Sequence, residues 1–165
     1  MKSYASFQGR VKSIEDFPIN QSGKDLGCYK FVSLIDNNDS IVNFIVSPTT
    51  YFVDHVMIKV GDIVTGFYDR NAPVPLIYPP QYRALIMAKN THYQNVKVDY
   101  FNSNLISSDG MLKLNIAPYT SVILENGQEF TKCPINRNLI VVYGPTTKSI
   151  PAQTTPYKIV VICDN

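Results

Sequence analysis

Tyrosine, arginine and lysine side chains recur in two proline-bearing stretches of the chain. The first stretch holds Tyr68, Arg70, Tyr78, Tyr82 and Arg83, and the second holds Tyr143, Lys148, Tyr157 and Lys158. The bases of a single-stranded nucleic acid stack on aromatic faces beside cations, at about 1 to 3 kcal/mol per base. Tyrosines also suit protein interfaces, because a planar ring buries area while its hydroxyl keeps a partner. These residues are the candidate binding residues.

The first of the two loops, 72–80, reads Ala-Pro-Val-Pro-Leu-Ile-Tyr-Pro-Pro. Proline already restricts the unfolded chain, so such a loop presents apolar and aromatic surface at little cost in entropy. This favours contact with another protein or with a second copy of the chain. The alternative interpretation is that the prolines only protect the edges of β-sheets from unwanted pairing.

Recognisable catalytic and metal-binding motifs are absent from the sequence. The two histidines, His55 and His92, have no partner at the spacing of metal ligands. No nucleophile elbow or phosphate-binding glycine loop occurs. The three cysteines, Cys28, Cys133 and Cys163, are widely spaced and are expected to be free thiols. We therefore expect a protein that is not an enzyme and has neither a metal nor a cofactor.

The composition predicts a packed β protein. Hydrophobic residues make up 45% of the 165 residues and charged residues 17%, which is enough apolar material for a core. Eleven tyrosines and eight phenylalanines favour strands, and eleven prolines favour the turns between them. The net charge is only +2 and the charges are scattered, so electrostatics does not indicate nucleic acid or a membrane surface.

The N-terminal residues carry no apolar run of the secretory type, and no segment approaches the roughly 18 apolar residues of a membrane span. The expectation is a cytoplasmic protein that does not enter a membrane.

Alternation of apolar residues between turn residues predicts strands along the whole chain. In the first half they are expected at 8–17, 28–35, 41–46, 56–68 with a turn at Gly61-Asp62, and 82–88. In the second half they are expected at 95–101, 105–106, 111–116, 122–124, 128–130, 139–143 and 157–163. Asp109-Gly110 and Asn126-Gly127 tolerate the positive φ angles of tight hairpin turns. Only 50–57 reads as a short helical turn.

The two halves resemble each other. An offset of 70 positions lays 39–50 on 109–120, and an offset of 75 lays Tyr68 on Tyr143 and Tyr82 on Tyr157. This predicts two similar units in tandem, 1–90 and 91–165, joined by a polar linker near 89–95. The opening Gly9-Arg10-Val11 and the later Val60-Gly61-Asp62 resemble the pattern of an OB-type barrel. A single two-sheet β-sandwich over both halves is the alternative.

The segments 66–83 and 142–156 resemble those of small uncharacterised proteins of clostridia and related Firmicutes. The resemblance spans most of the chain. It implies a bacterial origin, and it supplies neither an activity nor a role for any residue.

The sequence therefore predicts an all-β, non-enzymatic module for protein contacts, with self-association through the two loops as the first hypothesis. Single-stranded nucleic-acid binding through the tyrosines and cations is the competing hypothesis.

Overall fold

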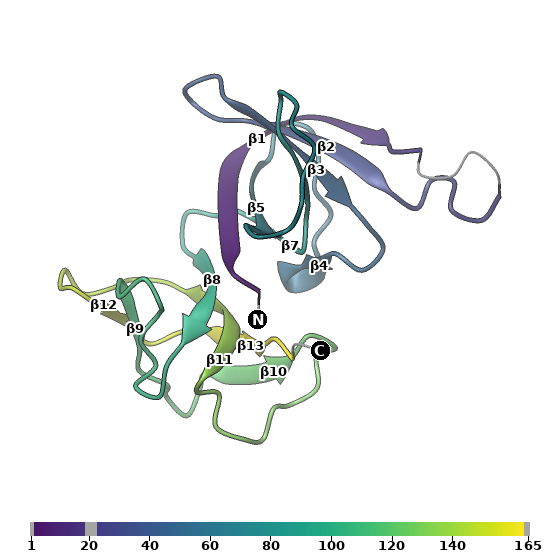
Figure 1. The fold of residues 1–165 in the computed structure, drawn as a ribbon. Helices are drawn as coiled ribbons and strands as arrows, with labels where there is room; N and C mark the ends of the chain where they lie inside the picture. The colour runs from purple at the N-terminus through teal and green to yellow at the C-terminus, as the bar shows by residue number, and fades with distance from the viewer. Residues whose placement is uncertain (1, 19–22, 164–165) are drawn as a thin grey trace. The chain divides into compact units, whose positions relative to one another are not determined.

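The computed structural model describes residues 2–18 and 23–163, and within them every regular element except one three-residue 3-10 turn is a strand (Figure 1). The prediction of an all-β chain is confirmed. The chain divides into two compact units, which we call the N-terminal unit (Lys2–Asn90) and the C-terminal unit (Thr91–Asn165). Each unit is described separately.

Seven strands of the N-terminal unit form one sheet in the order β4-β7-β5-β1-β2-β3-β6. Their bounds are Tyr4–Asp16 (β1), Lys30–Ile35 (β2), Ile41–Val46 (β3), Tyr51–Phe52 (β4), Ile63–Asp69 (β5), Gln81–Arg83 (β6) and Ile86–Lys89 (β7). Most neighbours are antiparallel, whereas β3 and β6 are parallel, as are β4 and β7. Only Ala84 and Leu85 separate β6 from β7, so one stretch of chain supplies strands near both ends of this order.

Strand β1 is long because it pairs with two neighbours in succession. Its first part, from Tyr4 to Arg10, pairs with β5, and the part from Arg10 onward pairs with β2, with an irregularity between Val11 and Ser13. A side chain at Gly9 would bring its Cβ within 2.8 Å of the Ile35 carbonyl oxygen. Glycine at residue 9 therefore permits the close approach of β1 to β2.

Alternate residues of these strands point into an apolar core. The fully or almost fully buried core side chains are Val11, Val32, Leu34, Val42, Phe44, Val46, Val64, Ala84 and Met87. Alternation with a period of two is what places them on one face of the strands. On the opposite face, Ser33 donates a hydrogen bond to Asn43 of the neighbouring strand, and both side chains are buried.

The C-terminal unit contains six strands, Asn95–Phe101 (β8), Leu112–Leu114 (β9), Ser121–Leu124 (β10), Arg137–Tyr143 (β11), Ala152–Thr154 (β12) and Lys158–Val161 (β13). They form a sheet in the order β10-β13-β11-β8 and a two-stranded sheet of β12 and β9. Isolated bridges join Phe101 to Ser107 and Ile106 to Lys113. The core consists of Phe101, Leu112, Leu114, Leu139, Val141, Ile159 and Val161.

Several local predictions need correction. Of the predicted strand 56–68 only the part from Ile63 onward forms, and the predicted strand 82–88 is interrupted between β6 and β7. Residues 128–130 form no strand after the Asn126-Gly127 turn, and only one bridge joins Ile123 to Glu129. The reason is that β10 pairs instead, in parallel, with β13, whose residues Ile159, Val160 and Val161 are buried. The predicted helical turn at 50–57 shrinks to a 3-10 turn at Val53–His55, which follows the short strand β4.

Candidate functional site

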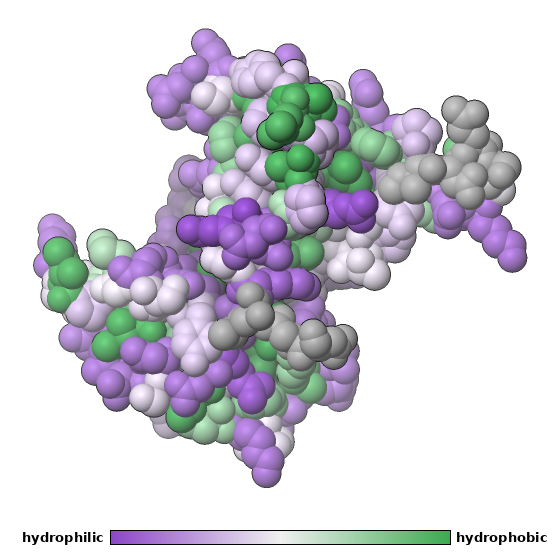
Figure 2. All heavy atoms as spheres, viewed as in Figure 1, coloured by the Kyte–Doolittle hydropathy of each residue, from purple (hydrophilic) through white to green (hydrophobic). Residues whose placement is uncertain are grey.

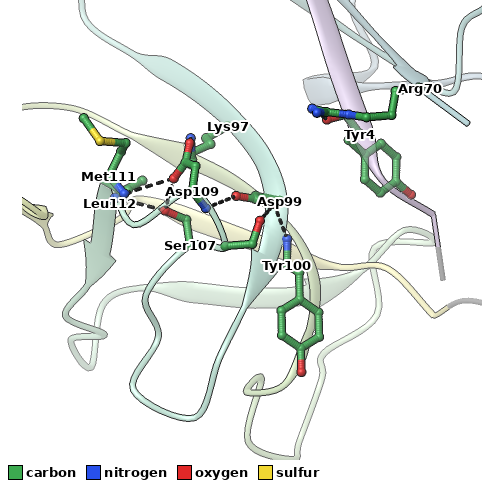
Figure 3. A network of polar contacts seen from close by, with 10 residues as sticks. Tyr4, Arg70, Lys97, Asp99, Tyr100, Ser107, Asp109, Met111 and Leu112 are labelled. Carbon is green, nitrogen blue, oxygen red and sulfur yellow. Dashed lines mark hydrogen bonds and ion pairs between the residues drawn. The ribbon is translucent and has the colours of Figure 1, made fainter.

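The loop between β5 and β6 begins with a fixed segment. The Arg70 amide donates to the Ser3 carbonyl oxygen at 2.9 Å, and the Arg70 guanidinium donates to the Tyr4 carbonyl oxygen at 2.8 Å (Figure 3). The Asp69 carboxylate accepts the Asn71 amide at 3.1 Å. These contacts fix the direction in which the chain leaves β5, because Arg70 is held against the backbone of Ser3 and Tyr4 at the start of β1.

Beyond that segment the loop exposes its apolar side chains. Leu76 is 100% exposed, Ile77 52% and Tyr78 77%. We call these three residues the loop tip. Four prolines, Pro73, Pro75, Pro79 and Pro80, flank it and lack the amide that would join a ladder. The tip therefore offers a short apolar surface that no other described segment covers. Apolar side chains reach the surface of the protein in several places (Figure 2).

A pocket of about 350 Å³ lies beside this loop, and its lining residues among those that the structure describes all belong to the N-terminal unit. Its apolar lining comes from Ile45, Tyr68, Ala72, Pro73, Val74, Pro75, Tyr82 and Leu85. Its polar lining comes from Lys2, Asp69, Gln81 and Arg83. Strands β3, β5 and β6 thus supply the walls, and the first part of the loop supplies the rim.

Two of the predicted residues, Tyr68 and Tyr82, form one wall of the pocket. Their ring centroids are 3.8 Å apart and the rings are almost parallel, at 7°. Both rings also contact the buried ring of Phe44, whose centroid lies 6.0 Å from that of Tyr68 and 6.2 Å from that of Tyr82. Burial is the largest cause that raises the pKa of Tyr68 above its ordinary value, and the hydrogen bond with Tyr82 is the second. The pair is therefore a rigid aromatic surface in which the neutral phenol of Tyr68 is favoured.

The predicted cations of this half have different surroundings. Arg83 is exposed at the end of β6 and lines the pocket, as does the exposed Lys2. Arg70 is held at the Tyr4 carbonyl. Lys2 was not among the predicted binding residues, because nothing in its local sequence indicates that β1 brings the N-terminal segment next to β5.

The predicted residues of the C-terminal unit do not form a second aromatic pair. Tyr143 ends β11 half-buried, and burial raises its pKa, with Lys97 acting in the opposite direction. Tyr157 precedes β13, and its hydroxyl oxygen lies 2.1 Å from where a Cβ on Gly144 would stand. No ring contact joins Tyr143 to Tyr157 among the residues that the structure describes. Lys148 is exposed on the loop between β11 and β12, and Lys158 begins β13.

The sequence offsets need one correction here. Tyr82 lies in β6 opposite Phe44, whereas Tyr157 follows β12 and donates its amide to the Val142 carbonyl oxygen. In the N-terminal unit the residue with that backbone contact is Leu85, which donates to Phe67. An offset of 75 residues therefore aligns Tyr68 with Tyr143 before the two loops but does not align the residues after them. The reason is that the loop between β11 and β12 is three residues shorter than the loop between β5 and β6.

A polar network in the C-terminal unit holds the turn before β9 (Figure 3). Asp109 accepts hydrogen bonds from Lys97 Nζ at 2.6 Å, Ser107 Oγ at 2.6 Å and the Met111 amide at 3.0 Å. Burial alone would raise the pKa of Asp109, but these hydrogen bonds and the Lys97 charge together lower it. The turn at Asp109-Gly110 was predicted, while the pairing with Lys97, twelve residues earlier, was not.

A second carboxylate extends that network. Asp99 accepts hydrogen bonds from Ser108 Oγ at 2.6 Å and from the Tyr100 amide at 2.8 Å. Both carboxylates are occupied by their own chain, so their arrangement stabilises the turn.

Groups suited to catalysis or to metal binding do not gather elsewhere in the described ranges. His55 and His92 are exposed, as are the free cysteines Cys28, Cys133 and Cys163. Among residues 2–18 and 23–163, no three histidine, cysteine or carboxylate side chains lie together as a metal site requires. In the same ranges, no helix has the length and apolar character needed to cross a membrane.

Comparison with known proteins adds no family to this description. No protein-family model matches the chain, and no curated protein matches it significantly in sequence. The fold class and the loop-and-pocket region of the N-terminal unit therefore carry the functional argument.

Proposed function

We propose that the chain is a non-enzymatic binding module that makes protein contacts through the loop between β5 and β6. Self-association is the first kind of contact that we propose. The observation that carries the proposal is the loop tip, whose Leu76 is 100% exposed next to the exposed Ile77 and Tyr78. Single exposed apolar residues are common on soluble proteins, whereas contiguous ones mark interaction sites. A tip held between prolines loses little further entropy on binding.

The loop between β11 and β12 supports a second contact of the same kind. Ile150 is 84% exposed there and directly precedes Pro151, as Tyr78 precedes Pro79. The loop is fixed near its start, because Thr147 accepts the Gln153 amide at 2.9 Å. One chain would then carry two apolar tips.

We further propose that each unit is an OB-type barrel and that the two units are copies of one ancestral unit. In such a barrel five strands close a Greek-key sheet. Support comes from pairings that recur in order: β1 with β5 and β8 with β11, then β5 with β7 and β11 with β13, all antiparallel. The parallel pairs recur as well, β3 with β6 and β9 with β12, and β4 with β7 and β10 with β13.

One turn supports common ancestry in atomic detail. Thr50 Oγ1 donates to the Ala84 carbonyl oxygen at 2.8 Å and accepts the Ser47 amide at 3.0 Å. Thr120, seventy positions later, donates to the Pro156 carbonyl oxygen at 2.9 Å and accepts the Ala117 amide at 3.2 Å. In each unit a threonine hydroxyl thus hydrogen-bonds both to its own turn and to the segment that precedes the last strand.

Sedimentation velocity over a range of concentrations tests the contact. We expect the wild-type chain to gain mass with concentration and Leu76→Asp to remain monomeric, because a carboxylate at the tip must be desolvated in the interface. Met57→Asp is the matched control, since Met57 is 77% exposed in the same unit but outside the loop. A wild-type chain that stays monomeric throughout contradicts self-association, and equal effects of the two variants contradict the assignment to the loop.

Single-stranded nucleic-acid binding is the second candidate, favoured by the stacked Tyr68 and Tyr82 with Arg83 at the same pocket. It predicts an affinity for an oligonucleotide that falls with salt and weakens with Arg83→Gln. Against it, the chain has a net charge of only +2. No binding of an oligonucleotide at low salt would remove this candidate.

A further inference from the structure

The pocket of the N-terminal unit combines an apolar interior with two lining cations, Lys2 and Arg83. The proposed contact at the loop tip does not use this pocket. Leu76, Ile77 and Tyr78 are not among its lining residues. Its volume of about 350 Å³ lies at the small end of the range for ligand pockets, roughly 300 to 1,000 Å³. A molecule of one or two rings fits that space.

The interior of the pocket is preorganised for a flat apolar group. Tyr68 and Tyr82 hold each other parallel over Phe44, so neither ring needs to reorient when a ligand arrives. Pro73 and Val74 bound the opening from the loop side, and the Asp69 contact with Asn71 keeps the start of that loop in place. A ring bound there would bury apolar surface on both sides.

The charges of the pocket do not cancel. Lys2 and Arg83 line it, and among the described residues neither is paired with a carboxylate. Asp69 is the one acidic lining residue within 2–18 and 23–163, and its carboxylate already accepts the Asn71 amide. Arg70 adds a third cation close enough to act on the Tyr68 hydroxyl. The electrostatic complement of this arrangement is an anion.

We propose that this pocket binds a small aromatic anion, a planar ring system bearing a carboxylate, sulfonate or phosphate group. The ring lies against the aromatic wall and the loop prolines, and the anionic group lies toward Arg83 and Lys2. An arginine pairs well with such groups because its planar fork offers two parallel donors. The proposal does not depend on the proposed protein contact, since it uses other residues.

Titration of the full chain with anilinonaphthalene sulfonate, followed by its fluorescence, tests the site. We expect enhanced emission with one probe bound per chain. Arg83→Gln should weaken binding about tenfold, as the loss of a charge-assisted contact predicts. The uncharged analogue phenylnaphthylamine should bind the wild type and Arg83→Gln equally. Lys12→Gln is the matched control, because Lys12 is an exposed cation of β1 outside the pocket.

A second variant tests the apolar part. Val74 is 41% exposed at the pocket opening, so Val74→Asp can fold while it places a carboxylate in the pocket. It should weaken binding of the charged probe and of its uncharged analogue together. Binding unchanged in both Arg83→Gln and Val74→Asp, or weakened equally by Lys12→Gln, overturns the proposal. Displacement of the probe by only one of the two compounds phenyl phosphate and phenylacetate supports the proposal and identifies the anionic group. Displacement by neither compound overturns the proposal.

Discussion

The ring of Phe44 fills the space in which a side chain at Gly66 would begin. A Cβ on Gly66 would lie 2.6 Å from two carbons of that ring. At offsets of 70 and 75 residues, the corresponding positions of the C-terminal unit hold Leu114 and Val141, both buried in its core. Under the common ancestry proposed for the two units, a large residue beside glycine in one unit corresponds to two medium-sized residues in the other.

This relationship predicts coupling between two substitutions. Gly66→Val alone should cost about 1 to 3 kcal/mol, because the added side chain overpacks the core. Phe44→Leu alone should destabilise by leaving a cavity. The double variant should be more stable than the sum of the single effects predicts, by about 0.5 to 3 kcal/mol. Urea unfolding of the four chains measures the coupling, and strictly additive effects would contradict the close contact between the Phe44 ring and residue 66.

The similar hydrogen bonds of Thr50 and Thr120 predict similar losses of stability. Thr50→Val and Thr120→Val each remove the hydroxyl that joins a turn amide to a distant carbonyl, so each should cost about 1 to 3 kcal/mol. Thr49→Val, which alters an exposed hydroxyl that bonds only within the same turn, should change stability by less than about 0.5 kcal/mol. Thermal unfolding provides the comparison. A large loss in only one of the two units would argue against a shared structural role.

The lowered pKa of Asp109 predicts acid sensitivity of the C-terminal unit. The ionised carboxylate is favoured in the folded state, so its contribution to stability is present above the ordinary carboxyl pKa of about 4. That contribution is lost as pH falls through the lowered value. Asp109→Asn should therefore reduce stability at neutral pH and show a shallower loss on acidification. Asp25→Asn, at an exposed carboxylate of the other unit, should keep the wild-type slope.

The raised pKa of Tyr68 predicts that this residue ionises at a higher pH than an ordinary tyrosine. Because burial and the Tyr82 hydroxyl both disfavour the phenolate, Tyr68 should ionise above the ordinary tyrosine pKa of about 10. Tyr82→Phe removes the second cause and should move the pKa of Tyr68 part of the way down. Titration of the tyrosine ring resonances by NMR reports both values. Ionisation of Tyr68 at the ordinary pKa in the wild type would show that the ring pair is open in solution.

Local sequence signals predicted some strands to the residue. Ile41–Val46 is a mainly apolar stretch after a turn cluster, whereas Asn95–Phe101 begins with alternating polar and apolar residues, and both strands form as expected. Strand β12 was not predicted, because Ala152–Thr154 is short and pairs only with the distant β9. A parallel pairing of that kind depends on long-range register, which a local pattern does not contain.

The candidate site was predictable only in part for the same reason. Tyr68 and Tyr82 were placed on one surface from their types and spacing, and they stack. That Lys2 lines the same pocket follows from the pairing of Tyr4 with Asp69 between β1 and β5. The sequence suggested an aromatic pair in each half, but the shorter second loop brings Thr154, not a tyrosine, opposite β9.

Hydrogen exchange of the wild-type chain at low and high concentration tests the central claim most directly, because it locates the contact as well as detecting it. The account predicts that the amides of residues 76–78 become protected as concentration rises, while the amides around Met57 exchange at an unchanged rate. A gain in mass with unchanged exchange at 76–78 would contradict the assignment of the contact to the loop between β5 and β6.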